Sequence, residues 1–306
     1  MQIKKLLLEL DPRKDNTPAL ARARSIARKF GADVELIVCE APQVIPAPTV
    51  MAPKSLTVAQ QGFRADLERW AAAKASELEE AGLTVNVTVT AEQPRYEAIL
   101  DLADTTNADL IMREMGQHGR LSRLLVGATD WDLIRHAKQP LWLVQPDDTD
   151  EARPNVLAAV DPLHPKDEQM NLDKRLLDIA EGLARALSGS LHVYHTFQLA
   201  PMVIAAPSVA AAAPQMDPGV VEEIEAAHRA SLDELLSGRA LDDNRLHLLE
   251  GDPAARIEEV IDANEIGVVV AGSISRSWLD RLLVGSTAES LLSAVSCDLV
   301  LLKAGS

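Results

Sequence analysis

The pentapeptide RLLVG occurs twice in this chain, at Arg123–Gly127 and again at Arg281–Gly285. A threonine follows two residues after each copy, and an amphipathic stretch then leads into a final apolar run. These runs are PLWLV at Pro140–Val144 and CDLVLL at Cys297–Leu302. The chain has 306 residues, a length that favours two domains. The repeat therefore predicts two copies of one fold, joined head to tail.

Each copy begins with a short apolar run closed by an aspartate, LLLELD ending at Asp11 and VLAAVD ending at Asp161. Helical stretches and further apolar runs then alternate in the same order in both copies. Such runs are typical of strands buried on both faces, and their alternation with helices predicts a parallel sheet with helices on both sides. The other strands are predicted at Val34–Cys39, Thr84–Thr90, Leu110–Met112, Ser190–His195, Arg245–Leu249 and Val268–Ala271. The fold class is thus α/β, with one open parallel sheet in each copy.

A charged run, DDTDEARP at Asp147–Pro154, separates the two copies. It places the first domain at residues 1–147 and the second at 153–306. The net charge of −16 argues against a nucleic-acid partner, because binding a phosphate backbone relies on clustered Lys and Arg. The two cysteines form no metal-binding motif and fit a reducing compartment. The N-terminus reads as a strand and no segment as a membrane span, so a cytoplasmic location is expected.

A ligand is expected where open parallel sheets bind one, beyond the carboxyl ends of the strands at the point where strand order reverses. In the second copy this edge holds Asp161 and the loop after Ala271. The loop reads Gly272-Ser273-Ile274-Ser275, and Gly285-Ser286-Thr287 follows nine residues later. Glycines let a backbone approach phosphate oxygens, and the helix that opens at Gly285 offers its N-terminus to an anion. The pattern predicts phosphate binding without the lysine of a P-loop.

The segment from Gly267 to Leu302 resembles the universal stress protein family, whose pattern after the fourth strand is G-x2-G-x9-G-[S/T]. Here it reads Gly272-x2-Ser275-x9-Gly285-Ser286, with serine in the second glycine position. The two-copy length and the signature ATDW at Ala128–Trp131 resemble the tandem E-type members. The resemblance implies an adenine-nucleotide α-hydrolase-like sheet ordered 3-2-1-4-5 in each half. It also implies that the two fifth strands pair, so that one chain mimics a dimer, and it allows a further homodimer.

The resemblance also implies an ATP site in the second half, with Mg²⁺ as a possible companion. Asp161 would meet the ribose or a bridging Mg²⁺, and Val193 would offer its backbone to adenine. The ribose and phosphate path would be lined by Ala271 and Gly272, and the phosphates would be held by Ser275, Gly285, Ser286 and Thr287. We therefore expect a regulatory, ATP-binding protein of the stress response.

The first half departs from this pattern. At the same spacing back from Gly127, Glu114 and Gln117 replace Gly272 and Ser275. A carboxylate about 4 Å from a phosphate charge costs roughly 4 kcal/mol at an effective dielectric constant of 20. Asp130 and Asp132 also fill the start of the following helix. We predict that the first half no longer binds a triphosphate, and that Asp11 is a turn residue.

Other functions stay open. One is a slow Mg²⁺-dependent ATPase in which Asp161 orients a water, although the sequence offers no convincing general base. Another is a binding module for an apolar or lipid ligand, because the uncharged insertions at 41–53 and 199–214 are rich in proline and small apolar residues. For these insertions a mobile lid or an interface is the preferred interpretation. Ser286 also fits a capping box that needs no ligand.

Neither a shared metal nor catalysis is expected of three histidines in the second half. His192 and His195 lie three apart on one predicted strand, so their side chains should face opposite ways and share no metal. His228 lies beside the apolar stripe of a predicted helix, and a hydrogen-bonded role is expected for it.

Overall fold

The computed structural model describes residues 2–40, 53–115, 128–146, 153–163, 167–198, 218–272 and 295–303. The first half comprises β1 (Lys5–Glu9), α1 (Thr17–Phe30), β2 (Asp33–Cys39), α2 (Pro53–Glu79), β3 (Val85–Thr90), α3 (Arg95–Thr106), β4 (Leu110–Glu114), α4 (Ala128–His136) and β5 (Leu141–Val144). The second half comprises β6 (Asn155–Ala159), α5 (Asp167–Leu187), β7 (Leu191–Phe197), α6 (Pro218–Leu235), the 3-10 helix η2 (Asp243–Arg245), β8 (Leu246–Glu250), α7 (Pro253–Ala263), β9 (Ile266–Gly272) and β10 (Asp298–Leu302). The predicted alternation of strands and helices is confirmed.

All ten strands form one sheet, in the order β3-β2-β1-β4-β5-β10-β9-β6-β7-β8. Neighbouring strands are parallel within each half, and both halves have the expected order 3-2-1-4-5. The halves meet where β5 and β10 pair antiparallel, with Trp142 opposite Val300. The expected pairing of the fifth strands is thus confirmed, and it merges the two expected sheets into one.

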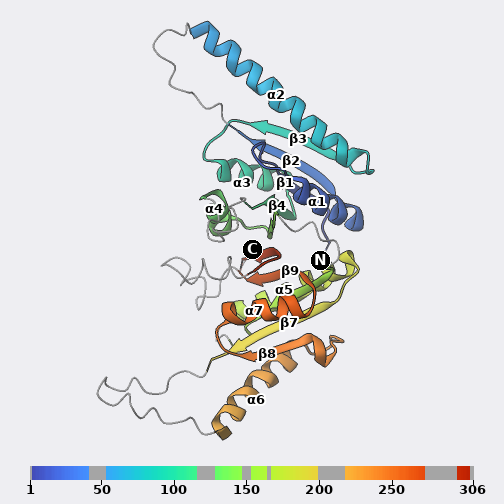
Figure 1. Ribbon diagram of the computed structural model, residues 1–306, viewed down its shortest axis with the longest axis vertical. Helices are drawn as coiled ribbons and strands as arrows, with labels where there is room; N and C mark the ends of the chain where they lie inside the picture. Colours follow the sequence, from blue (N-terminus) through green and yellow to red (C-terminus); the bar gives the residue numbers. More distant parts are fainter. Residues whose placement is uncertain are drawn as a thin grey trace, which may run out of the picture.

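Helices cover both faces of this sheet, because alternate strand residues are apolar on both sides. One core lies under α1, α2, α5 and α6, and includes Leu6, Leu8 and Val193. The other lies under α3, α4 and α7, and includes Leu7 and Tyr194. In Figure 1, α2 lies at the β3 end of the sheet and α6 at the β8 end.

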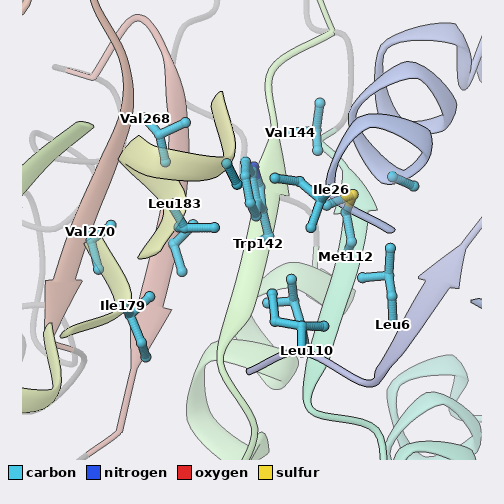
Figure 2. Close-up of a cluster of buried hydrophobic side chains, with 14 of the residues drawn as sticks. Leu6, Ile26, Leu110, Met112, Trp142, Val144, Ile179, Leu183, Val268 and Val270 are labelled. Carbon is cyan, nitrogen blue, oxygen red and sulfur yellow. The ribbon is translucent and has the colours of Figure 1, made fainter. Parts of the chain in front are cut away.

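The first of these cores continues from one half into the other. Figure 2 shows Trp142 of β5 between Met112 and Ile26 of the first half and Leu183 and Val268 of the second. All five side chains are fully or almost fully buried. The two halves therefore share packing as well as a strand pair.

Where the chain enters the second half, its backbone packs against two glycines that leave no space for a side chain. A Cβ added to Gly189 would lie 2.0 Å from the carbonyl oxygen of Pro154, and one added to Gly267 would lie 2.0 Å from that of Arg153. The backbone of residues 153 and 154 thus packs directly on the loop at Gly189 and on the start of β9 at Gly267.

The insertions predicted as a lid, interface or apolar site lie outside the described residues, apart from Pro53, which begins α2. Over the ranges that the structure does describe, none of the helices combines the length and hydrophobicity needed to span a bilayer.

Candidate nucleotide site and its degenerate twin

The strand registers align the two halves residue by residue. Glu9 of β1 pairs with Arg113 of β4, and Ala159 of β6 pairs with Ala271 of β9. Glu9 lies two residues before Asp11, and Ala159 lies two residues before Asp161. Arg113 therefore corresponds to Ala271. The next residues, Glu114 and Gly272, also correspond, as their spacing from the two RLLVG copies predicts.

Three of the predicted ligand residues lie together at the carboxyl edge of the second half. Ala271 and Gly272 end β9, where they pair with Leu301 and Leu302 of β10. Asp161 follows β6 directly beside them and is half-buried. Its backbone N–H lies 3.4 Å from a carboxylate oxygen of buried Asp173.

Gly272 has a packing role that the sequence did not reveal. A Cβ at this position would lie 2.8 Å from the Cδ2 atom of Leu172 in α5. The absence of a side chain is therefore explained by the approach of α5 as well as by access for a ligand. A bulky replacement here would disturb the core, so it would not report on ligand binding alone.

Val193 lies apart from this edge. It is fully buried in the middle of β7, paired with Ala158 on one side and Leu246 on the other. The residues of β7 that reach the carboxyl edge are His195 to Phe197. The contact of Val193 with adenine stays a prediction. Ser275, Gly285, Ser286 and Thr287 lie outside the described residues, as do both copies of RLLVG.

The same edge of the first half is filled by a network of charged side chains. The guanidinium of Arg95 contacts Asp11 at 2.8 Å, Glu40 at 2.9 Å and Glu9 at 3.4 Å. The guanidinium of Arg113 lies 2.9 Å from Asp130 and 3.6 Å from Glu9. The side chains of Arg95 and Arg113 are only 11% and 4% exposed, so both are enclosed in protein.

Asp11 is more than the turn residue that we predicted. It does accept a hydrogen bond from the backbone N–H of Arg13, as a turn aspartate would, but it also binds the guanidinium groups of Arg13 and Arg95. Burial alone would raise the pKa of this carboxyl. The Arg13 hydrogen bonds and the charge of Arg95 more than offset that effect and hold the pKa well below its usual range.

Glu114 does not act as we predicted. We expected its carboxylate to face a phosphate cradle, but it lies near the N-terminus of α1, where the backbone N–H groups of Asn16 and Ala19 act on its pKa. Lys14 donates to the carbonyl of Glu114. Burial raises the pKa of this carboxyl, and the nearby Lys14 and the helix N–H groups oppose that rise. Glu114 therefore lies beside the start of α1, and the Arg95 and Arg113 network fills the first-half edge instead.

The second half replaces this network with small side chains. Glu9 and Arg113 become Ala159 and Ala271, and Glu114 becomes Gly272. Thr90 of β3 corresponds to Leu249 of β8, because their partners on β2 and β7 correspond. Arg95 and Ala254 each follow five residues later, so they correspond as well. Both halves thus share one backbone plan, but at these four positions the described part of the second half has alanine or glycine where the first half has charged side chains.

Two histidine pairs distinguish the second half further. Nδ1 of His195 lies 2.9 Å from the carbonyl oxygen of Val160, and its Nε2 lies 2.7 Å from Nδ1 of His228 in α6. On the other face of β7, His192 lies 3.0 Å from His247. The prediction that His192 and His195 face opposite ways is confirmed, and so is a hydrogen-bonded role for His228. Among the described residues, no group of three His, Cys, Asp or Glu side chains is arranged to hold a metal.

Sequence reasoning missed both the histidine pairs and the arginine network. Each joins residues far apart in the chain, such as Arg95 with Asp11 or His228 with His195. Strand periodicity indicates the face on which a residue lies but not the partner that it meets there. A position-by-position alignment of the two copies would have indicated the arginine network, because charged residues of one copy align with alanines of the other.

The chain matches the model of the "Universal stress protein family" twice, over residues 2–145 and 153–303. It is 25% identical over 301 residues to "Universal stress protein E" of Photorhabdus laumondii, covering 97% of this chain and 94% of that one. It is 24% identical over 303 residues to the protein of the same name in Escherichia coli K12, covering 97% and 93% of the two chains.

Solved structures share the fold over the whole chain. A protein of unknown function from Pseudomonas aeruginosa PAO1 has a TM-score of 0.72 at 23% identity, covering 99% of this chain and 93% of that one. A universal stress protein from Archaeoglobus fulgidus has a TM-score of 0.62 at 15% identity, covering 99% and 97%. The repeated halves, the strand order and these matches together show that the chain belongs to the universal stress protein family, with two such domains in tandem.

Proposed function

We propose that the chain is a regulatory protein of the stress response whose second half binds ATP, while its first half binds no nucleotide. One contrast between the halves carries this proposal. Ala159, Ala254, Ala271 and Gly272 stand where the first half has Glu9, Arg95, Arg113 and Glu114. A nucleotide needs room beside the strand ends, and among the described residues these substitutions remove four large or charged side chains from the second-half edge.

In this proposal Asp161 accepts hydrogen bonds from the ribose hydroxyls, and Ala271 and Gly272 line the path to the phosphates. Val193 contributes through its backbone on the adenine side, and Ser275, Gly285, Ser286 and Thr287 hold the phosphates. A Mg²⁺ ion arriving with ATP would be held chiefly by the phosphates and water, which is its usual mode with nucleotides. Its role would be to neutralise phosphate charge.

Isothermal titration of nucleotide-free protein with ATP tests the proposal. We expect about one site per chain, because one of the two edges is filled. The variant Ala271→Arg copies Arg113 into the second half and should weaken binding at least tenfold by filling the edge. Ala240→Arg is the matched control, since it adds the same charge at an exposed position of the same half and should leave binding unchanged.

Two results would contradict the proposal. One is the absence of measurable heat at millimolar ATP with the wild-type protein. The other is undiminished binding by a folded Ala271→Arg variant, since ATP would then occupy some other part of the molecule.

A further inference from the structure

His195 and His228 occupy positions that the fold does not require to be polar. The backbone N–H of Leu10 donates to Ile37, and that of Val160 donates to Tyr194, so the next residues, Val38 and His195, correspond. Leu78 and Leu235 are buried leucines near the ends of α2 and α6. Ala71 and His228 each lie seven residues, or two helical turns, before them, so these two residues correspond. In place of His195 on the strand and His228 on the helix, the first half thus has Val38 and Ala71, which are both fully buried.

The hydrogen bonds of the pair fix where its protons lie. A carbonyl oxygen can only accept, so Nδ1 of His195 carries the hydrogen that is shared with Val160. Nε2 of His195 then has a lone pair and accepts from Nδ1–H of His228. Nε2 of His228 is left as the basic atom of the pair, and His228 is only half-buried.

This arrangement takes up one proton readily and a second one poorly. A proton on Nε2 of His228 keeps the bond to His195 intact, because Nδ1 of His228 still donates. A second proton, on Nε2 of His195, would set two N–H groups against each other at 2.7 Å. The pair therefore behaves as a single proton-binding site.

Asp161 is the charged side chain that acts on both rings. Burial lowers the pKa of His195 and that of His228, and the negative charge of Asp161 opposes this in both cases. The ring of Phe197 lies 5.4 Å from that of His228 and carries no charge. The neighbouring cation on α6, Arg229, pairs with Asp233 and Asp243.

In the part of the chain that the structure describes, the two positions that supply cations to the twin of Asp161 hold no charged residue in the second half. In the first half Asp11 contacts Arg13 and Arg95. The equivalent positions in the second half hold Leu163, which is exposed, and Ala254. An anion arriving beside Asp161 therefore meets a like charge, and a proton on the adjacent histidine pair would offset that repulsion.

We infer that the His195–His228 pair is a ligand-linked proton site, so that the second half binds its anionic ligand together with a proton. The inference rests on the proposed function, because it concerns the same edge of the sheet. It makes nucleotide affinity rise as pH falls. Between pH 8 and pH 6 we expect ATP to bind about threefold to tenfold more tightly.

The test is titration calorimetry with ATP at pH 6.5, in buffers of different ionisation enthalpy, which counts the protons taken up per nucleotide bound. The double variant His195→Val with His228→Ala copies Val38 and Ala71, a combination that already packs in this fold. His247→Thr copies Thr88 and breaks the pair on the other face, so it serves as the control. Any protonation of ATP itself is common to all three proteins and cancels in the comparison.

We expect the wild type and His247→Thr to take up about half a proton more per ATP than the double variant. Equal uptake in the wild type and the double variant, with ATP binding intact, would overturn this inference and leave the proposed function standing. The absence of ATP binding to the wild type at any pH would overturn both.

Discussion

The indole Nε1–H of Trp142 in β5 donates a hydrogen bond of 2.9 Å to the carboxylate of Asp298 in β10. The same carboxylate accepts from Nε of Arg22 at 2.8 Å and from the backbone N–H of Gln145 at 3.0 Å. Asp298 is fully buried and belongs to the second half, whereas all three donors belong to the first. The guanidinium of Arg22 also lies 6.0 Å from the centre of the Trp142 ring. One carboxylate thus links the two halves at the point where β5 and β10 pair.

Replacing Asp298 should therefore destabilise the whole chain. Asp298→Ala leaves Arg22 and the Trp142 N–H buried without their acceptor, and losing one partner of a buried pair costs about 3–5 kcal/mol. Urea unfolding followed by circular dichroism should show this loss. Asp262→Ala is the control, because Asp262 pairs with Arg153 at 3.9 Å on the surface and should cost less than about 1 kcal/mol. Equal stability of the two variants would contradict the role given to Asp298.

The two glycines under the linker should tolerate no side chain. In Gly189→Ala and in Gly267→Ala, the new methyl group would overlap a backbone carbonyl, and either change should destabilise the chain by about 1–3 kcal/mol. Gly62→Ala is the matched control. Gly62 lies within α2 with open space around it, so alanine there should stabilise the helix by about 0.5–1 kcal/mol. Thermal unfolding of the three variants would separate these effects by their sign.

The first-half network should be replaceable only as a unit. Arg113→Ala removes the cation that lies between Glu9 and Asp130, and the loss should be about 3–5 kcal/mol. The triple variant Glu9→Ala, Arg113→Ala and Asp130→Ala copies the alanines that the second half has at the corresponding positions. Urea unfolding should find the triple variant more stable than the single one. A triple variant that is less stable would mean that the network is not a closed set of charges.

The stability of the second half should fall in mild acid because of His192. Burial lowers the pKa of His192 to about 4, from a usual value near 6.5. The unfolded chain therefore binds the proton more readily, and the stabilisation present above pH 6.5 is lost as pH falls toward 4. The contribution of this residue is up to about 3 kcal/mol over that range. His192→Gln should flatten this part of the pH profile of unfolding, and an unchanged profile would contradict the prediction.

Much of the fold could be predicted because its signals are local. The runs ending at Asp11 and Asp161 and the repeated RLLVG specify the strands and the twofold plan without any knowledge of contacts. Side-chain partners could not be predicted in this way. Glu114 illustrates the limit, because its position in the alignment was right while its environment, the N-terminus of α1, depends on how a distant helix packs.

The candidate site was predictable to the same degree. Asp161, Ala271 and Gly272 do meet at one edge, since the register of parallel strands brings their ends together. The reason why the twin edge differs lies in Arg95 and Arg113, two residues that the sequence motif does not include. Their importance follows from the carboxylates around them, and these come from the ends of β1 and β2 and from α4.

The central claim is that one of two equivalent sheet edges admits a nucleotide and the other is filled by the protein itself. A crystal structure of the chain grown with ATP tests it most directly. We predict nucleotide density beside Asp161 and Gly272, and an intact contact of Arg113 with Asp130 in the first half. Density beside Arg113 with none beside Asp161 would contradict the claim.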